Sequence, residues 1–119
     1  MITLKTLPKA TAQQVFDQVV NHLLTQNARS TSEKFCLYRD KIHSLKCAAG
    51  CLIGDDEYKE EFEGKTWLRL RTQGDVPSEH LALILGLQEI HDNFPPDAWL
   101  VELQDFAKNL GLSFNLEKK

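Results

Sequence analysis

The sequence has no long hydrophobic run, only three cysteines and few aromatic residues. No apolar stretch approaches the roughly 20 residues that span a bilayer, so a transmembrane segment is not expected. The start of the chain, Met1–Lys5, has neither an apolar core nor a cleavage site, and a secretory signal is not expected either. Three cysteines are an odd number without the spacing of a disulfide framework. Together these absences predict a protein of the reducing cytoplasm.

An excess of positive charge is also missing, because the formal net charge is −3. Domains that bind nucleic acid usually present a basic face, so this class is the least favoured and would have to use the basic segment 34–46. An acidic segment, 55–63, lies close behind it in the sequence. The two segments predict either solvated faces or complementary patches that attract a protein partner or a second copy of the chain.

What is present is the composition of an ordinary globular domain, with 42% hydrophobic and 26% charged residues. We expect one domain over residues 1–119, with a loosely held tail over 113–119. The apolar spacing predicts a mainly α fold of about four to five helices with one short β-hairpin. An α+β fold is the alternative, because residues 66–71 fit either a helix or a strand.

Apolar spacing and capping residues predict two helices in the first two thirds of the chain. Thr11 and Gln14 have the spacing of a capping box, and an apolar stripe follows as far as Leu24. Residues 66–71 alternate like a strand, but Thr66 as a cap favours a short helix.

Two more helices are predicted in the last third. Ser78 is the N-cap candidate for the first of them, and Pro95–Asp97 ends it and starts the second, which Gly111 ends. The predicted core joins apolar residues from all parts of the chain: Phe16, Leu23, Leu52, Ile53, Leu85 and Leu103.

A central stretch of small apolar residues, 45–56, is predicted to be the packing surface of the fold. The strand formers around it predict a hairpin between 35–38 and 42–47. Four-residue spacing in 47–53 predicts a short buried helix, and 56–62 predicts a short acidic one.

Gly50 lies in the middle of this stretch. Small residues let neighbouring segments approach closely, so a bulky side chain at this position would overpack the core. We expect Gly50→Leu to destabilise the protein strongly and Gly50→Ala to be tolerated.

Several segments of the chain carry a resemblance to known sequences: Cys36–Tyr38, Leu45–Ile53, Asp55, Asp56, Tyr58, Glu63–Lys65, Leu87–Asp92, Trp99 and the closing helix through Gly111 and Leu112. In these segments the chain resembles a family of small uncharacterised proteins of bacteria, phages and mobile gene cassettes. The family carries no established activity, so the resemblance implies a fold, including a helix over 66–71, and no mechanism.

The cysteines are the first candidates for chemistry. Cys36, Cys47, Cys51 and His43 include the ligand types of a zinc site, but their spacing is poor for one. Free cysteine usually behaves as a small buried hydrophobe, and we expect Cys47 and Cys51 to be largely buried. A redox pair of Cys47 and Cys51 is a weaker alternative.

His91 and Asp92 are the second candidate. Adjacent side chains on a helix point about 100° apart, so we do not expect the two to form a dyad by themselves. His91 is better explained as a histidine at a helix end.

No catalytic, cofactor-binding or metal-binding residue is therefore assigned, and no cofactor is expected. The leading hypothesis is a non-catalytic module that binds a protein partner or forms a homodimer. The alternative is a small thiol- or histidine-dependent enzyme, or a ligand binder, with a pocket near Cys47, Cys51 and His91. Trp67 is an interaction candidate because tryptophan is enriched in interfaces, and basic residues complete the candidate set: Arg39, Lys41, Arg69 and Arg71.

Overall fold

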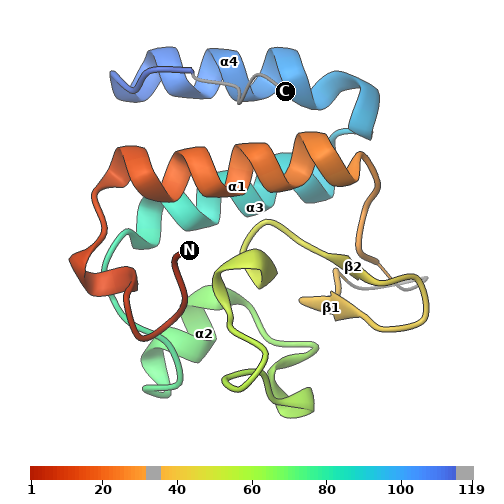
Figure 1. Cartoon of the computed structure of the whole chain (residues 1–119), viewed down its shortest axis with the longest axis vertical. Coiled ribbons are helices and arrows are strands. Elements are labelled where there is room, and N and C mark those ends of the chain that lie inside the picture. The colour runs from red at the N-terminus through yellow and green to blue at the C-terminus, as the bar shows by residue number, and fades with distance from the viewer. Residues whose placement is uncertain (32–35, 115–119) are drawn as a thin grey trace.

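The computed structural model of the chain describes residues 1–31 and 36–114 (Figure 1). With 3₁₀ turns included, 53% of the described residues are helical, and they form four α-helices and one two-stranded antiparallel hairpin. The predicted mainly α fold is confirmed. None of the described helices is both long and apolar enough to cross a membrane.

Three helices pack together in the upper half of Figure 1. These are α1 (Ala12–Gln26), α3 (Leu81–Asn93) and α4 (Trp99–Leu110), and each contacts the other two. A 3₁₀ turn, Pro96–Ala98, leads into α4, and Gly111 ends that helix with a φ of 70°, as predicted.

The shorter elements lie below these helices. Helix α2 (Trp67–Thr72) packs against α3. Strand β1 (Arg39–Asp40) pairs with β2 (Leu45–Lys46), and a 3₁₀ turn at Gly50–Leu52 contacts α1. Two more 3₁₀ turns complete the fold, at Leu7–Lys9 and Glu60–Phe62.

Helix α1 begins and faces the core as its sequence predicts. The Thr11 side chain accepts a hydrogen bond from the Gln14 backbone N–H, and the Gln14 side chain accepts one from the Thr11 backbone N–H. The helix ends at Asn27, whose φ is 51°. Its apolar stripe is buried: Val15, Phe16, Val19, Val20 and Leu23.

The polar side of α1 holds other segments through three glutamines. Each of them bonds both the backbone N–H and the backbone C=O of one distant residue. Gln18 bonds Ile2 at 2.7 and 2.9 Å. Gln26 bonds Lys46 at 2.9 and 2.8 Å, and Gln13 bonds Ser113 at 2.8 Å in both directions. We call these three side chains the glutamine clamps.

The C-terminal segment is held as far as the structure describes it. One glutamine clamp bonds Ser113, and the ring of Phe114 lies edge-on to Phe16 with 6.3 Å between the centroids. The predicted loose tail covers 113–119, of which residues 115–119 lie outside the described part.

The hairpin is shorter than predicted and is shifted along the chain. Arg39 pairs with Lys46 and Asp40 with Leu45, whereas the predicted first strand was 35–38. Asp40 accepts a hydrogen bond from the His43 backbone and so stabilises the turn between the strands. Phe35, part of the predicted first strand, lies outside the described residues.

The predicted helix over 47–53 is wrong, because only a 3₁₀ turn forms there. In a longer helix the N–H of Gly54 would bond the carbonyl of Gly50. It bonds the Glu57 carboxylate instead, at 2.8 Å, and Ile53 is extended. Cys47 is fully buried as expected, whereas Cys51 is only partly buried.

The predicted acidic helix over 56–62 is also wrong, and its sequence forms a turn followed by a 3₁₀ turn. Besides the N–H of Gly54, the Glu57 carboxylate accepts those of Leu4 and Lys5, at 2.9 and 3.0 Å. Glu57 therefore ties the N-terminal segment to the centre of the fold.

These bonds predict an acid-sensitive contribution to stability. Burial raises the pKa of Glu57, but the backbone N–H groups of Gly54, Leu4 and Lys5 outweigh it, so the pKa lies below its ordinary value of 4.5. A carboxyl whose pKa is lower in the folded chain stabilises the fold fully above the unfolded value. That contribution is lost as the pH falls through the folded value.

We therefore expect Glu57→Gln to lower the free energy of unfolding by about 1–2 kcal/mol at neutral pH. The difference from the parent should shrink as the pH falls below 4.5. Urea unfolding at a series of pH values measures it, with Asp56→Asn as the control because this exposed carboxylate makes no such bonds. A difference that stays constant down to about pH 3 would contradict the assignment.

The predicted start of α3 is wrong by a few residues. The helix begins at Leu81 after His80, which adopts a φ of 62°, and Ser78 is not its cap. The His80 ring bonds the carbonyl of Ala10, which holds the turn in this position. Helix α2 is confirmed, with the Thr66 hydroxyl accepting from the Arg69 backbone. The predicted core is buried except for Leu85, which is half-buried.

Candidate functional site

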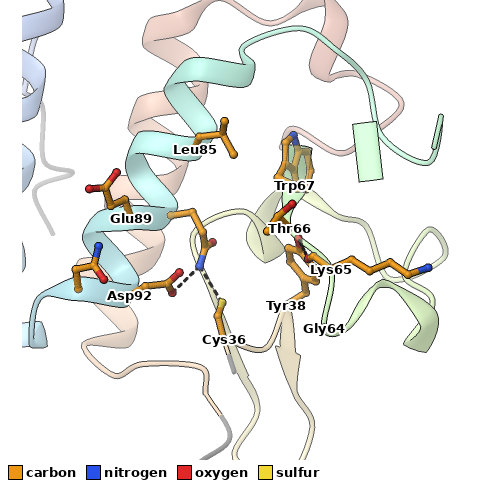
Figure 2. Close-up of a pocket in the computed structure, with 11 residues that line it drawn as sticks. Cys36, Tyr38, Gly64, Lys65, Thr66, Trp67, Leu85, Glu89 and Asp92 are labelled. Carbon is orange, nitrogen blue, oxygen red and sulfur yellow. Dashed lines mark hydrogen bonds between the residues drawn. The ribbon is translucent and has the colours of Figure 1, made fainter. Parts of the chain in front are cut away.

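A pocket of about 350 Å³ lies between α3 and the segment that leads into α2 (Figure 2). One wall comes from α3, and the facing wall from 64–67 and 36–38. The lining residues are Cys36, Tyr38, Gly64, Lys65, Thr66, Trp67, Leu85, Gln88, Glu89, Asp92 and Asn93.

The α3 wall follows from helical spacing. Leu85, Gln88 and Asp92 are three and four residues apart, so they lie on one face of the helix. This face changes from apolar at Leu85 to polar at Asp92, and Figure 2 shows these two side chains on the side of the helix that faces Cys36 and Trp67. The site therefore has an apolar end and a polar end.

The Gln88 amide organises the polar end. Its oxygen accepts the N–H of Ala49 at 2.9 Å, which fixes the orientation of the amide. Its nitrogen donates to Cys36 Sγ and to Asp92 Oδ1, each at 2.8 Å (Figure 2). Both protons of the amide nitrogen are therefore used.

His91 is fully buried behind this group and stacks on Trp99, with 5.5 Å between the ring centroids. Its Nε2 accepts the backbone N–H of Ser30 at 3.1 Å, so the ring proton lies on Nδ1. Nδ1 then donates to Asp92 Oδ1 at 2.8 Å.

The expectation that His91 and Asp92 do not form a dyad is therefore wrong. The 100° angle applies to the directions of the Cβ atoms, whereas rotation of both side chains at the helix end brings the two polar atoms together. Burial lowers the pKa of His91 and the hydrogen bond to Asp92 raises it, while the backbone N–H that bonds Nε2 opposes protonation of the ring.

Cys36, His91 and Asp92 nevertheless do not form a nucleophilic triad. Such a triad needs one ring nitrogen facing the thiol and the other facing the carboxylate. Here Nε2 is occupied by Ser30 and Nδ1 by Asp92, so no free lone pair can take the thiol proton. A hydrogen bond with Cys47 and burial also raise the pKa of the Cys36 thiol far above its ordinary value.

The same three side chains place one thiol, one imidazole and one carboxylate atom within 4.8 Å of one another, as in a metal site. The Gln88 nitrogen, however, already lies among them. It bonds the sulfur and the carboxylate at 2.8 Å and is 3.4 Å from His91 Nδ1. A metal ion would have to displace this amide and the proton on Nδ1, so the arrangement does not fit one.

The zinc set considered from the sequence is not brought together either. His43 bonds Asp40 at 2.8 Å in the exposed hairpin turn. The Cys51 thiol donates to the carbonyl of Ala48. Only Cys36 and Cys47 of that set lie within hydrogen-bonding reach of each other.

Trp67 contributes the most unusual polar atom of the pocket wall. The residue is 2% exposed, and its Nε1 is buried without a hydrogen-bond partner among the described residues. A buried N–H without a partner costs about 1–3 kcal/mol, and the Nε atoms of Arg39 and Arg71 are in the same condition. Trp99, the other tryptophan, donates its Nε1 to the carbonyl of Phe94 at 3.0 Å.

The basic interaction candidates lie elsewhere and contact their own chain. Arg39 pairs with Asp55 at 2.7 Å, and Lys41 pairs with Glu60 at 3.1 Å. Arg39 also lies over the Tyr58 ring, 5.0 Å from its centroid. The other two basic candidates are on α2, where Arg69 is exposed and Arg71 is half-buried. Among the five interaction candidates, only Trp67 lines the pocket.

Sequence reasoning missed Cys36, Gln88 and Asp92 as parts of one site. A mixed apolar and polar face at 85, 88 and 92 was the available signal. Several pocket residues also belong to the segments on which the family resemblance rests, among them Cys36, Tyr38 and Gly64. Comparisons with protein families, with curated proteins and with solved structures find no match to this chain.

Proposed function

We propose that the protein binds a small organic molecule in the pocket between α2 and α3. The observation that carries this proposal is a pocket of about 350 Å³ whose apolar walls converge on a fixed polar group of Gln88, Asp92 and Cys36. Ligand sites are typically mostly apolar cavities of this size with a few precisely held polar atoms.

Binding without catalysis accounts best for the chemistry of the site. His91 is blocked as a base by Ser30, and the pKa of the Cys36 thiol is raised, so neither is an activated catalytic group. The role as a protein-interaction module stays a prediction, whose test is the oligomeric state in solution.

Nuclear magnetic resonance of the two indole N–H groups tests the proposal directly. We expect members of a library of small aromatic and aliphatic fragments to shift the signal of Trp67, which lines the pocket. The signal of Trp99 should change little, because its N–H is bonded to Phe94. Trp67→Phe assigns the two signals.

A pocket variant provides the control. Leu85 is half-buried in the apolar wall, so Leu85→Arg places a long charged side chain at the pocket and should abolish the shifts. Val101→Arg on α4 is the matched change, because Val101 is 56% exposed and does not line the pocket. Fragment shifts that survive Leu85→Arg, or a library in which no fragment shifts Trp67, would contradict the proposal.

A further inference from the structure

We infer that the ligand is a protonated amine with an apolar body, held by the carboxylate of Asp92. This inference rests on the proposed function and specifies its ligand class. It follows from the distribution of charge and of free polar atoms in the pocket.

The polar end of the pocket presents one carboxylate oxygen that is ready to accept. Asp92 Oδ1 accepts hydrogen bonds from the N–H groups at His91 Nδ1 and Gln88 Nε2. Oδ2 has no hydrogen-bond partner among the described residues. The Asp92 side chain is 37% exposed. Because two donors fix the carboxylate through Oδ1, Oδ2 is held in a constant direction without being neutralised.

No cation of the described chain offsets this charge inside the pocket. Lys65 is the one basic residue of the lining, and Figure 2 shows its side chain running away from Asp92. The His91 ring is neutral in this arrangement, since its Nε2 accepts a hydrogen bond from the backbone N–H of Ser30 and so carries no proton. The second acid of the lining, Glu89, is exposed, and Figure 2 shows its carboxylate on the side of α3 away from Cys36, so the negative charge inside the pocket is that of Asp92. The pocket therefore complements a positive ligand.

The opposite end fits the apolar body of such a ligand. Trp67 and Tyr38 supply aromatic rings, 6.3 Å apart between centroids, and Leu85 faces them from α3. The Tyr38 hydroxyl is already used, since it donates to the carbonyl of Lys65 at 2.6 Å. This end of the pocket therefore offers a ligand mainly apolar contacts.

A set of three probes of similar size and different charge tests the inference. Phenethylamine is the cation, 2-phenylethanol the neutral analogue and phenylacetate the anion. Each is titrated near neutral pH, where an aliphatic amine is protonated and an aspartate ionised. The readout is the Trp67 indole signal. We expect the amine to bind most tightly and the anion most weakly.

Asp92→Asn then removes the charge and keeps an oxygen that can accept from His91 and Gln88. We expect it to weaken amine binding about threefold to tenfold, the range for a partly exposed charge-assisted hydrogen bond, and to leave the alcohol unchanged. Asp105→Asn, an exposed acid on α4, makes the same change in net charge and should alter neither.

The outcomes separate the inference from the proposed function. Equal binding of the amine and the alcohol, or tighter binding of the anion, would overturn the inference while the pocket remained a ligand site. Binding of none of the three probes, in a protein whose pocket also ignores the fragment library, would overturn both. If Asp92→Asn does not fold, the ranking of the three probes on the parent protein decides.

Discussion

Gly50→Ala is expected to destabilise the protein by about 3 kcal/mol, and Gly50→Leu by more. A Cβ atom at position 50 would overlap the carbonyl oxygen of Tyr38 and would lie 2.9 Å from its carbonyl carbon. These are backbone atoms next to β1, so they cannot turn away as a flexible side chain can. The expectation that alanine is tolerated at this position is therefore wrong. The close approach of another segment to Gly50, which was also expected, is present.

Midpoints of urea unfolding measure this effect. Gly64→Ala is the control, because Gly64 has a φ of 78° and no atom within 4 Å of an added Cβ. It should cost only the strain of a left-handed alanine, about 1–2 kcal/mol. If Gly50→Ala unfolds at the midpoint of the parent, the backbone of Tyr38 does not lie against Gly50.

Glu63→Ala is expected to cost about 4 kcal/mol, and Glu63→Gln about 2 kcal/mol. The Glu63 carboxylate accepts the backbone N–H groups of Tyr38 and Arg39, at 2.9 and 3.1 Å. It also accepts the hydroxyl of Tyr58 at 2.6 Å. Alanine removes both acceptor oxygens and so all three hydrogen bonds. Glutamine keeps one oxygen but turns an N–H₂ group toward a donor, so part of the bonding is lost.

The matched control is Glu61→Gln, which changes the same charge two residues away on an exposed side chain. We expect it to shift the urea midpoint by less than about 0.5 kcal/mol in free energy of unfolding. Equal effects of the substitutions at 61 and 63 would show that Glu63 acts through its charge alone. Because Tyr38 lines the pocket, loss of Glu63 should also alter the Trp67 indole signal.

Elements whose partners are nearby in the sequence were predictable. The capping box of Thr11 and Gln14 and the C-terminal stop at Gly111 each depend on residues a few positions away. The short helices predicted over 47–53 and 56–62 failed for the opposite reason. The carboxylate of Glu57 accepts hydrogen bonds from the backbone N–H groups of Gly54 and of the distant N-terminal segment. The sequence around Glu57 gives no sign of its bonds to that distant segment.

The candidate site was harder to predict than the fold, because its contacts are long-range. Gln88 meets the N–H of Ala49 and the sulfur of Cys36 only after α3 has packed against the rest of the chain. The sequence directed attention to Cys47 and Cys51, which are closer together in the chain, whereas Cys36 is the cysteine that lines the pocket. His91, which the alternative hypothesis named, lies behind the pocket and does not line it, and its hydrogen bond to Asp92 was not foreseen.

The glutamine clamps have a consequence for how this sequence can vary. Each clamp binds only the backbone of its partner, so the side chains at positions 2, 46 and 113 are not chosen by it. The clamping positions 13, 18 and 26 have no such freedom, because glutamate lacks the donor and asparagine is one methylene shorter. Related sequences that keep this fold should therefore retain glutamine at positions 13, 18 and 26 on α1. The residues at positions 2, 46 and 113, which these glutamines bond, should vary. Spontaneous deamidation of any one of the three would turn its amide into a carboxylate. The bond donated to the distant backbone C=O would be lost, and that segment would be held less firmly.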